Sequence, residues 1–120
     1  MHVKRLKPIR GDEIGQRVTA REGFINTTGK LRGGWVRFKD PDNDVYVVWS
    51  YSLPIYIYVA AGGKWLTGMD SKSLTVARHR TVARPQVPAS QIERRDALTM
   101  IEIEQRGLLG AIRDRLARAV

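Results

Sequence analysis

The chain has 120 residues, a length that suits one domain whose hydrophobic core holds without disulfides. It contains no cysteine, which excludes disulfides, zinc–thiolate sites and a cysteine nucleophile. Its formal net charge of +9 favours polyanionic partners such as nucleic acid. The basic start is followed by no apolar run, and no stretch is as long as a membrane span, so the expected location is the cytoplasm.

The positive charge is concentrated in two places along the chain. Residues 1–40 carry a net charge of +6. A second basic cluster consists of Lys72, Arg78, Arg80 and Arg84. Neutralisation of phosphates by such groups is a main source of affinity for nucleic acid, whereas the alternative is a solvated basic surface on a protein that binds something else.

Short β-strands are predicted for the first two thirds of the chain. One or two are expected around residues 17–19 and 23–25. Apolar and polar side chains alternate over 35–39, turn-forming residues occupy 40–44, and a β-branched and aromatic run covers 45–51. This succession predicts a hairpin with a longer loop.

Three more strands complete an antiparallel meander. They are expected at residues 55–59, 64–67 and 74–82. In the first of them the aliphatic side chains of Ile55, Ile57 and Val59 share one face, whereas Tyr56 and Tyr58 share the other.

The last part of the chain predicts an amphipathic helix. Ser90 and Glu93 fit a capping box, which places the start of the helix at residue 91. An apolar stripe at helical spacing consists of Leu98, Ile101, Leu108, Leu109, Ile112, Leu116 and Val120. Gly107 and Gly110 either kink this helix or divide it into two. A stripe of this length predicts a homo-oligomer, with the six residues from Leu98 to Leu116 as its interface.

These patterns predict an α+β protein, in which a small antiparallel β-sheet or partly open barrel is followed by a C-terminal amphipathic helix. The expected divisions are a basic β-rich part over 1–84, a proline-containing linker over 85–90, and the helix over 91–120. Together they are expected to form one compact unit.

No catalytic or metal-binding constellation is recognisable. Asp40, Asp42 and Asp44 have the spacing of the start of a calcium loop but lack the glycine and the glutamate that such a loop requires. His79 has no acid or nucleophile tied to it by spacing, so we interpret it as a hydrogen-bonded strand residue. The expectation is a protein that is not an enzyme and holds neither metal nor cofactor.

One side of the strand over 35–39 carries Trp35, Arg37 and Lys39. An aromatic ring beside two cations is typical of surfaces that stack a base and neutralise phosphates. The candidate nucleic-acid-binding residues are Trp35, Arg37, Lys39, Tyr56, Tyr58, Arg78 and Arg80. Two alternatives remain open: Trp35 lies in the core while Arg37 and Lys39 extend their charged ends to solvent, or the tyrosine face packs under the C-terminal helix.

Residues 47–79 contain the segments V-V-W-S-Y-x-x-P-I, G-K-W, S-L-T and R-H. The stretch resembles a domain of unknown function in small proteins of tailed phages and prophages, notably actinobacteriophages, and in some archaeal proteins. The matching positions are Ser50, Tyr51, Pro54, Ile55, Trp65, Ser73, Thr75 and His79. The resemblance implies a β-rich fold and a phage setting, and it implies no activity. If Ser50, Tyr51, Thr75 and His79 converge, the simplest interpretation is a hydrogen-bond network that locks adjacent strands.

Three functional hypotheses follow. The first is a phage accessory protein that binds nucleic acid through its basic half and the aromatic strand face. The second is a protein-interaction module that engages a host or phage protein, with the helix as its docking or oligomerising element. The third and weakest is an enzyme centred on His79. The first two are compatible, since a helix-mediated dimer would present two basic sheets.

Overall fold

The structure of the chain, a computed structural model, describes residues 6–68 and 73–118. Its helices are α1 (Gly11–Thr19), α2 (Leu74–Val82) and α3 (Ala97–Arg118), with short 3₁₀ helices η1 (Pro41–Asn43) and η2 (Ala89–Gln91). Its strands are β1 (Phe24–Ile25), β2 (Leu31–Val36), β3 (Val45–Ser50), β4 (Leu53–Val59), β5 (Lys64–Gly68) and β6 (Ile92–Arg95). Lys72 of the predicted basic cluster and Val120 of the predicted stripe lie outside the described residues.

The six strands form one sheet in chain order, from β1 at one edge to β6 at the other. Neighbours from β1 to β5 are antiparallel, as the predicted meander requires, and the sheet stays open. The predicted hairpin is confirmed, because Trp35 of β2 pairs with Tyr46 of β3. The α+β class is confirmed with one difference: β6 runs parallel to β5, so the sheet is mixed.

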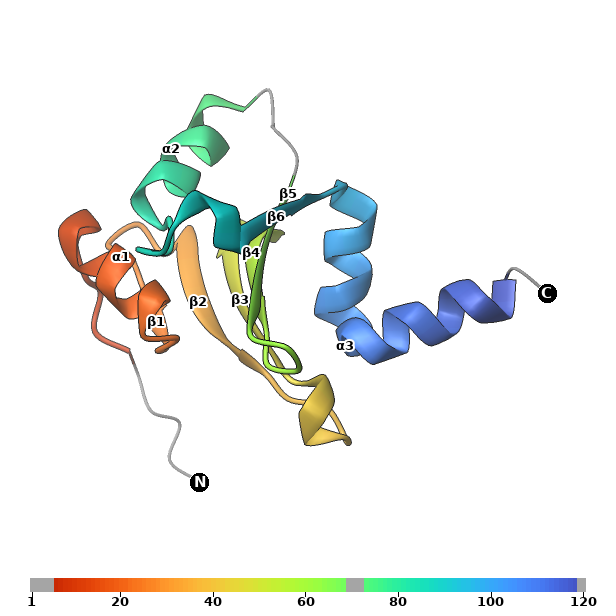
Figure 1. Ribbon diagram of the computed structural model, residues 1–120. Helices are drawn as coiled ribbons and strands as arrows, with labels where there is room; N and C mark the ends of the chain where they lie inside the picture. The colour runs from red at the N-terminus through yellow and green to blue at the C-terminus, as the bar shows by residue number, and fades with distance from the viewer. Residues whose placement is uncertain (1–5, 69–72, 119–120) are drawn as a thin grey trace.

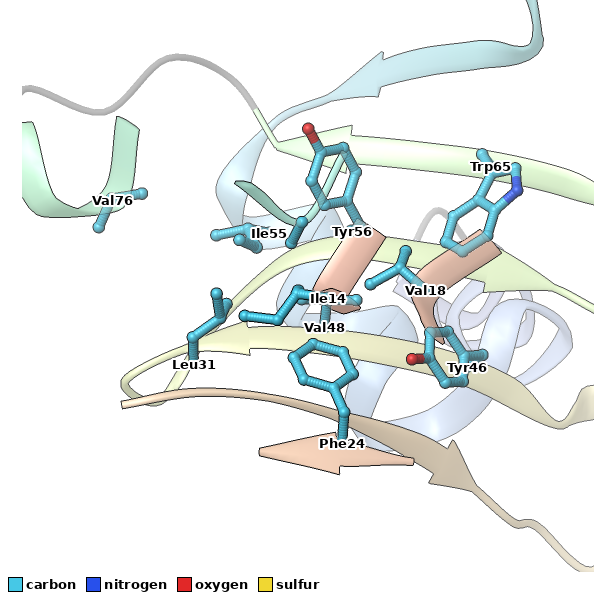
Figure 2. Close-up of a cluster of buried hydrophobic side chains, with 11 residues drawn as sticks. Ile14, Val18, Phe24, Leu31, Tyr46, Val48, Ile55, Tyr56, Trp65 and Val76 are labelled. Carbon is cyan, nitrogen blue, oxygen red and sulfur yellow. The ribbon is translucent and has the colours of Figure 1, made fainter. Parts of the chain in front are cut away.

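Helices cover both faces of this sheet (Figure 1). On the side of α1 and α2 the buried cluster consists of Ile14, Val18, Phe24, Leu31, Tyr46, Val48, Ile55, Tyr56, Trp65, Val76 and Ala83 (Figure 2). On the side of α3 it consists of Val45, Val47, Ile57, Val59, Leu66, Met100, Ile103 and Ala111. Because alternate residues of β3 point to opposite faces, its nearly continuous buried run contributes to both clusters.

A bulge changes the face of one residue on β4. The register of β3 against β4 shifts between Val48 and Trp49, which leaves Ile55 as an extra residue on β4. Ile55 therefore packs on the α1/α2 side, whereas Ile57 and Val59 pack under α3. The prediction that these three side chains share one face is wrong at Ile55, because the bulge interrupts the two-residue period.

Residues 17–19, expected in a strand, lie in α1. Ile14 and Val18 are both buried, and their spacing of four residues places them on one side of a helix. The β-branched Thr19 fits there because its hydroxyl donates to the carbonyl one turn earlier, at 2.7 Å. The strand expected around residues 23–25 is confirmed as β1.

Residues 74–82, also expected as a strand, form α2. Ser73 caps this helix, since its hydroxyl accepts a hydrogen bond of 3.3 Å from the N–H of Val76. Val76 is the buried residue of α2, and it packs on the α1/α2 side of the sheet. The β-branched residues in this segment favour a strand by propensity alone, but the cap and the tertiary contacts outweigh that preference.

Residues 92–95, expected in the first turn of the C-terminal helix, form β6. Glu93 does not close a capping box but forms an ion pair with Lys64 of β5, at 2.6 Å. The helix begins after Asp96, whose carboxylate accepts from the N–H of Thr99 at 2.8 Å, and this hydrogen bond holds the pKa of Asp96 below its usual value. The capping-box prediction is wrong because the edge of β5 takes these residues as a parallel partner.

The label α3 covers two helices that meet at a kink at Gly107, whereas Gly110 lies within the second of them. Of the alternatives that the sequence left open, the division into two therefore applies, at Gly107. Gly107 has φ 72° and ψ 169°. Asn43 of η1 joins the two halves: its Nδ2 donates to the carbonyl of Arg106 at 2.7 Å, and its Oδ1 accepts from the N–H of Leu109 at 2.9 Å. A Cβ at position 107 would lie 2.2 Å from the Asn43 side chain, so both the space and the positive φ require glycine.

Ion pairs also link the two halves of α3 across the inside of the bend. Glu102 lies 3.5 Å from Arg115 and 3.3 Å from Arg118, and Arg106 pairs with Asp114. Exposed pairs contribute only about 0–1 kcal/mol each, but the side chain of Glu102 is only 16 % exposed. Its pairs therefore hold the bend together with the contacts of Asn43. Beyond it, the second half of α3 runs away from the sheet (Figure 1).

Candidate nucleic-acid interface

An aromatic row crosses the sheet on the α1/α2 side, with one ring from each of the strands β2 to β5. Its members are Trp35, Tyr46, Tyr58 and Trp65, which occupy paired positions. Ring centroids lie 5.8 Å apart for Trp35–Tyr46, 6.1 Å for Tyr46–Trp65 and 5.1 Å for Tyr58–Trp65. Tyr46 and Trp65 are buried, whereas Trp35 and Tyr58 are half-buried and form the accessible part of the row.

Each of the two accessible rings carries a guanidinium group. The Arg37 guanidinium lies 4.8 Å from the ring centroid of Trp35, and that of Arg21 lies 4.5 Å from Tyr58. The indole Nε1 of Trp35 donates to the backbone carbonyl of Arg21 at 3.0 Å, and this hydrogen bond links the Trp35 ring to the residue whose guanidinium lies on Tyr58. Lys39 is exposed just beyond β2. We call these five residues, Arg21, Trp35, Arg37, Lys39 and Tyr58, the basic aromatic surface.

Arg37 also has an acidic partner. Its Nη1 lies 3.0 Å from Oδ2 of the buried Asp44, whose Oδ1 accepts from the N–H of Phe38 at 2.8 Å. The hydrogen bond from the Phe38 N–H is the main cause that holds the pKa of Asp44 below its usual value, and the hydrogen bond from Arg37 adds to it. Part of the charge of Arg37 is thus compensated by Asp44.

The strand predicted over 35–39 is wrong in its bounds, because β2 ends at Val36 and Arg37 and Lys39 follow it outside the strand. The alternative that Trp35 lies in the core applies in part. Val36 and Phe38 pack toward the α3-side cluster, whereas Trp35 packs against the opposite cluster. Trp35 is half-buried, so it belongs to the core and to the surface at once. The tyrosine face packs under α1 and α2, so the alternative that it packs under the C-terminal helix does not apply.

Tyr56 does not extend the accessible platform. Its side chain is 4 % exposed, and its hydroxyl donates to the carbonyl of Arg80 at 2.7 Å. Burial raises the pKa of Tyr56 above its ordinary value. Arg78 and Arg80 lie on α2, away from β2: Arg78 is exposed and Arg80 is half-buried. Sequence spacing suggested one surface because it treated residues 74–82 as another strand of the sheet.

The network predicted for Ser50, Tyr51, Thr75 and His79 forms in part. A hydrogen bond of 2.6 Å joins Ser50 Oγ and His79 Nδ1, and the Tyr51 ring lies 6.0 Å from the imidazole. Thr75 is exposed on the first turn of α2. The contact therefore joins β3 to α2, whereas the sequence predicted a network between adjacent strands. Burial is the main cause that lowers the pKa of His79, and the positive charge of Lys30 lowers it further.

A serine hydroxyl against an imidazole also has the geometry of an activated nucleophile. Ser50, however, is 0 % exposed, so its hydroxyl does not reach the surface where a substrate would bind. Tyr51 next to it has φ 57°, a left-handed conformation, as the chain turns from β3 into β4. The described geometry of this pair is that of a structural clamp.

The residues predicted as an oligomer interface divide into two groups on α3. Leu98, Ile112 and Leu116 are 66 %, 45 % and 64 % exposed. Ile101, Leu108 and Leu109 are half-buried. The buried residues that face the sheet from α3 are instead Met100, Ile103 and Ala111. The single stripe drawn along a straight helix is therefore wrong, because the bend at Gly107 turns the second half away from the first.

Arg21 is the functional candidate that sequence reasoning missed. It lies in the turn after α1 with φ 55°, and it meets Tyr58 only because α1 packs beside the aromatic row. Its place in the basic N-terminal part of the chain was the only signal in the sequence. A contact between residues so far apart in the chain carries no spacing pattern.

Comparison with protein-family models, with curated proteins and with solved structures found no match to this chain. Within residues 6–68 and 73–118, no helix is long and apolar enough to cross a membrane. The same residues contain no cluster of three or more histidine and acidic side chains that would hold a metal ion.

Proposed function

We propose that this chain is a non-enzymatic nucleic-acid-binding protein that contacts single strands through the basic aromatic surface. The observation that carries the proposal is the pair of half-buried rings, Trp35 and Tyr58, each with a guanidinium on its face. Stacking of bases on aromatic rings beside cations is the usual mode of sequence-tolerant binding to single strands. The net charge of +9 supports the same class of ligand.

To stack on Tyr58 or Trp35, a base must displace the guanidinium group that lies on that ring. An exposed cation–π contact is worth about 0.5–1 kcal/mol, whereas a stacked base is worth about 1–3 kcal/mol. A base that displaces Arg21 from Tyr58 therefore gains free energy, and the displaced guanidinium is then close to the phosphates that flank that base. The same exchange at Trp35 is opposed by the ion pair between Arg37 and Asp44.

The resemblance of residues 47–79 supports a phage setting. Under this proposal the chain is an accessory protein of a tailed phage and acts in the host cytoplasm. The matching residues Ser50, Ser73 and His79 attach and cap α2, so they support the fold rather than a ligand site.

The test is fluorescence anisotropy with labelled single-stranded DNA, duplex DNA and RNA across a range of salt. We expect affinity to fall linearly with log salt, and we expect Arg21→Gln with Lys39→Gln to reduce the slope by about one to two. The matched control is Arg78→Gln with Arg113→Gln, which removes the same charge from exposed positions outside the basic aromatic surface. Equal loss in both pairs would indicate a diffuse basic surface.

Removal of a ring has a different expected signature. Tyr58→Ala should weaken binding by roughly 1–3 kcal/mol while the salt slope stays nearly constant, because stacking involves no counterion release. A thermal melt of the variant separates lost stacking from lost stability. Absence of binding to all three probes at about 50 mM salt would remove the proposal.

A second function, a protein-interaction module that assembles copies of this chain, is favoured by one observation. Ile112 and Leu116 are exposed on the half of α3 that runs away from the sheet. A second copy would cover them. Light scattering at about 100 μM should detect an oligomer that Ile112→Glu with Leu116→Glu converts to a monomer. A monomeric wild-type protein at that concentration would exclude this function.

A further inference from the structure

Two aromatic rings outside the basic aromatic surface also carry a cation on their face. The Arg32 guanidinium lies 4.5 Å from the ring centroid of Trp49, and Nζ of Lys30 lies 5.6 Å from that of Tyr51. The arrangement is the same as on Trp35 and Tyr58, where each ring has a guanidinium on its face. It therefore has the same chemistry at a second place on the molecule.

The two ring–cation pairs are neighbours at the end of β2 and β3 that lies opposite their connecting loop. Arg32 of β2 is paired in register with Trp49 of β3. One further hydrogen bond continues the pairing, since the N–H of Tyr51 donates to the carbonyl of Lys30 at 2.6 Å. Two residues along a strand span only about 7 Å, so both rings and both cations lie close together. We call these four residues, Lys30, Arg32, Trp49 and Tyr51, the Trp49 surface.

The Trp49 surface is separate from the basic aromatic surface. Trp49 packs against the cluster on the α3 side of the sheet, whereas Trp35 packs against the cluster on the opposite side. On β2, Arg32 and Trp35 are three residues apart and therefore project to opposite faces. A ligand on one surface needs no residue of the other.

The Trp49 surface is open to a ligand. Tyr51 is 48 % exposed, Lys30 and Arg32 are exposed, and Trp49 is half-buried. Gly34 follows Arg32 by two residues on the same side of β2, and a Cβ at Gly34 would meet nothing within 4 Å. The sheet beside the Arg32 guanidinium therefore has room for a chain that runs along it.

The charge that this surface offers is positive. Neither Lys30 nor Arg32 forms an ion pair with a carboxylate of the described residues. The nearby carboxylate of Glu104 accepts a hydrogen bond of 2.8 Å from Nε1 of Trp49, which fixes the indole ring. Burial is the main cause that lowers the pKa of His79 on α2, and the charge of Lys30 adds to it, so the positive potential of Lys30 extends to that helix.

We propose that the Trp49 surface is a second site for single-stranded nucleic acid, so that one chain holds two single-stranded segments at once. Bases stack on Tyr51 and Trp49, and the cations that they displace meet the flanking phosphates. This inference rests on the proposed function for the class of its ligand, but it uses none of the residues of the basic aromatic surface. An acidic peptide would use the two cations without the ring faces and is the less complete match.

The three tryptophans of the chain provide separate reporters for the test. The indole N–H resonance of Trp49 reports on the Trp49 surface, that of Trp35 reports on the basic aromatic surface, and the buried Trp65 is the reference. A thymidine oligonucleotide of about six nucleotides, a length that suits one site, is titrated into isotopically labelled protein at about 50 mM salt. We expect saturable shifts of the Trp49 and Trp35 resonances, and two oligonucleotides bound per chain.

Variants of the Trp49 surface should affect one of the two sites. Lys30→Gln with Arg32→Gln should weaken the binding reported by Trp49 at least about tenfold, because two phosphate contacts are lost at low salt, and should reduce the stoichiometry to one. Tyr51→Ala should weaken the same site at least about fivefold through lost stacking. The binding reported by Trp35 should change by less than about threefold in both variants. All three positions are exposed, and thermal melts verify that the variants fold.

The matched control removes the same charge from exposed positions elsewhere, with Lys64→Gln and Arg113→Gln. Lys64 begins β5, and Arg113 lies on the second half of α3. This double variant should change the binding reported by Trp49 by less than about threefold, as expected for screened surface charges. Equal weakening in the two double variants would overturn the second site.

The reporters also separate this inference from the proposed function. A Trp35 resonance that saturates while the Trp49 resonance stays fixed would overturn the second site and leave the proposed function standing. Movement of Trp49 alone would support this site and remove the basic aromatic surface, and movement of neither would overturn both. A glutamate-rich peptide of equal charge that shifts the Trp49 resonance as strongly as the oligonucleotide would overturn the assignment to nucleic acid and identify an acidic protein partner.

Discussion

The two faces of the sheet are built from the same strands but are stabilised in different ways. On the α1/α2 face, aromatic side chains donate hydrogen bonds to backbone carbonyls at 2.6–3.0 Å, and these donors are Trp35, Tyr46 and Tyr56. On the α3 face the buried side chains of the strands are aliphatic. α3 is held by one hydrogen bond from the sheet, from Trp49 Nε1 to the carboxylate of Glu104 at 2.8 Å, and by a contact outside the sheet, where Asn43 meets the bend at Gly107.

This difference explains where the basic aromatic surface lies. Hydrogen bonds are directional, and those from three aromatic side chains to the backbone place α1 and α2 at defined positions. On the α3 face one such side chain, Trp49, bonds the helix, and most of the contact is aliphatic packing, which is not directional. The guanidinium groups of the basic aromatic surface come from the turn after α1 and from the residue that follows β2, and both lie on rings of the α1/α2 face. Three predictions test the comparison, from the largest expected effect to the smallest.

The first prediction tests the contact between Asn43 and the bend of α3. Gly107→Ala should lower the free energy of unfolding by about 2–4 kcal/mol, because alanine at φ 72° and ψ 169°, a conformation that essentially only glycine adopts, costs about 1–3 kcal/mol and the clash removes the two hydrogen bonds of Asn43. Chemical denaturation measures this loss. Gly34→Ala is the control, since a Cβ at Gly34 meets nothing within 4 Å. Equal stability of the two variants would show that Asn43 does not specify the bend.

The second prediction tests one hydrogen bond on the α1/α2 face, which the hydroxyl of Tyr46 donates. The hydroxyl of the fully buried Tyr46 donates to the carbonyl of Glu22 at 2.6 Å. Tyr46→Phe should cost about 1–3 kcal/mol, because the carbonyl is left without this donor. Tyr51→Phe is the control, since Tyr51 is 48 % exposed, and it should change stability by less than about 0.5 kcal/mol. If the two variants lose the same amount, directional bonding does not distinguish this face.

The third prediction concerns the clamp between β3 and α2. The pKa of His79 is lowered from 6.5 by burial and by Lys30, so the unfolded chain takes up this proton at a higher pH than the folded chain. The stabilisation is therefore present above about pH 6.5 and is lost as pH falls through the folded pKa.

Melting temperatures at about pH 7.5 and pH 5.5 test this sign. The wild-type protein should lose more stability on acidification than His79→Gln, which retains a polar partner for Ser50. The pKa values of Asp44, Glu93 and Asp96 are lowered from ordinary values that already lie below this window, so these carboxylates contribute little to the difference. An identical pH dependence of the two proteins would show that the clamp does not couple to protonation.

Local pattern was sufficient to predict the α+β class, the hairpin of β2 and β3, the antiparallel run to β5 and the C-terminal helix. These features depend on alternation and on turn residues such as those at 40–44, which act between neighbours in the chain. The opposite sides taken by Trp35 and Val36 were predictable for the same reason, since alternate residues of a strand point to opposite faces, but the strand ends at Val36, before Arg37 and Lys39.

Tertiary structure decided what depends on distant partners. Residues 74–82 form a helix that is capped by Ser73 and docked through His79, and residues 92–95 form a strand because β5 offers them an edge. The bulge at Ile55, the bend held by Asn43, and the meeting of Arg21 with Tyr58 join segments that lie far apart or out of period in the chain. No sequence spacing encodes a contact whose geometry exists only after the sheet has formed.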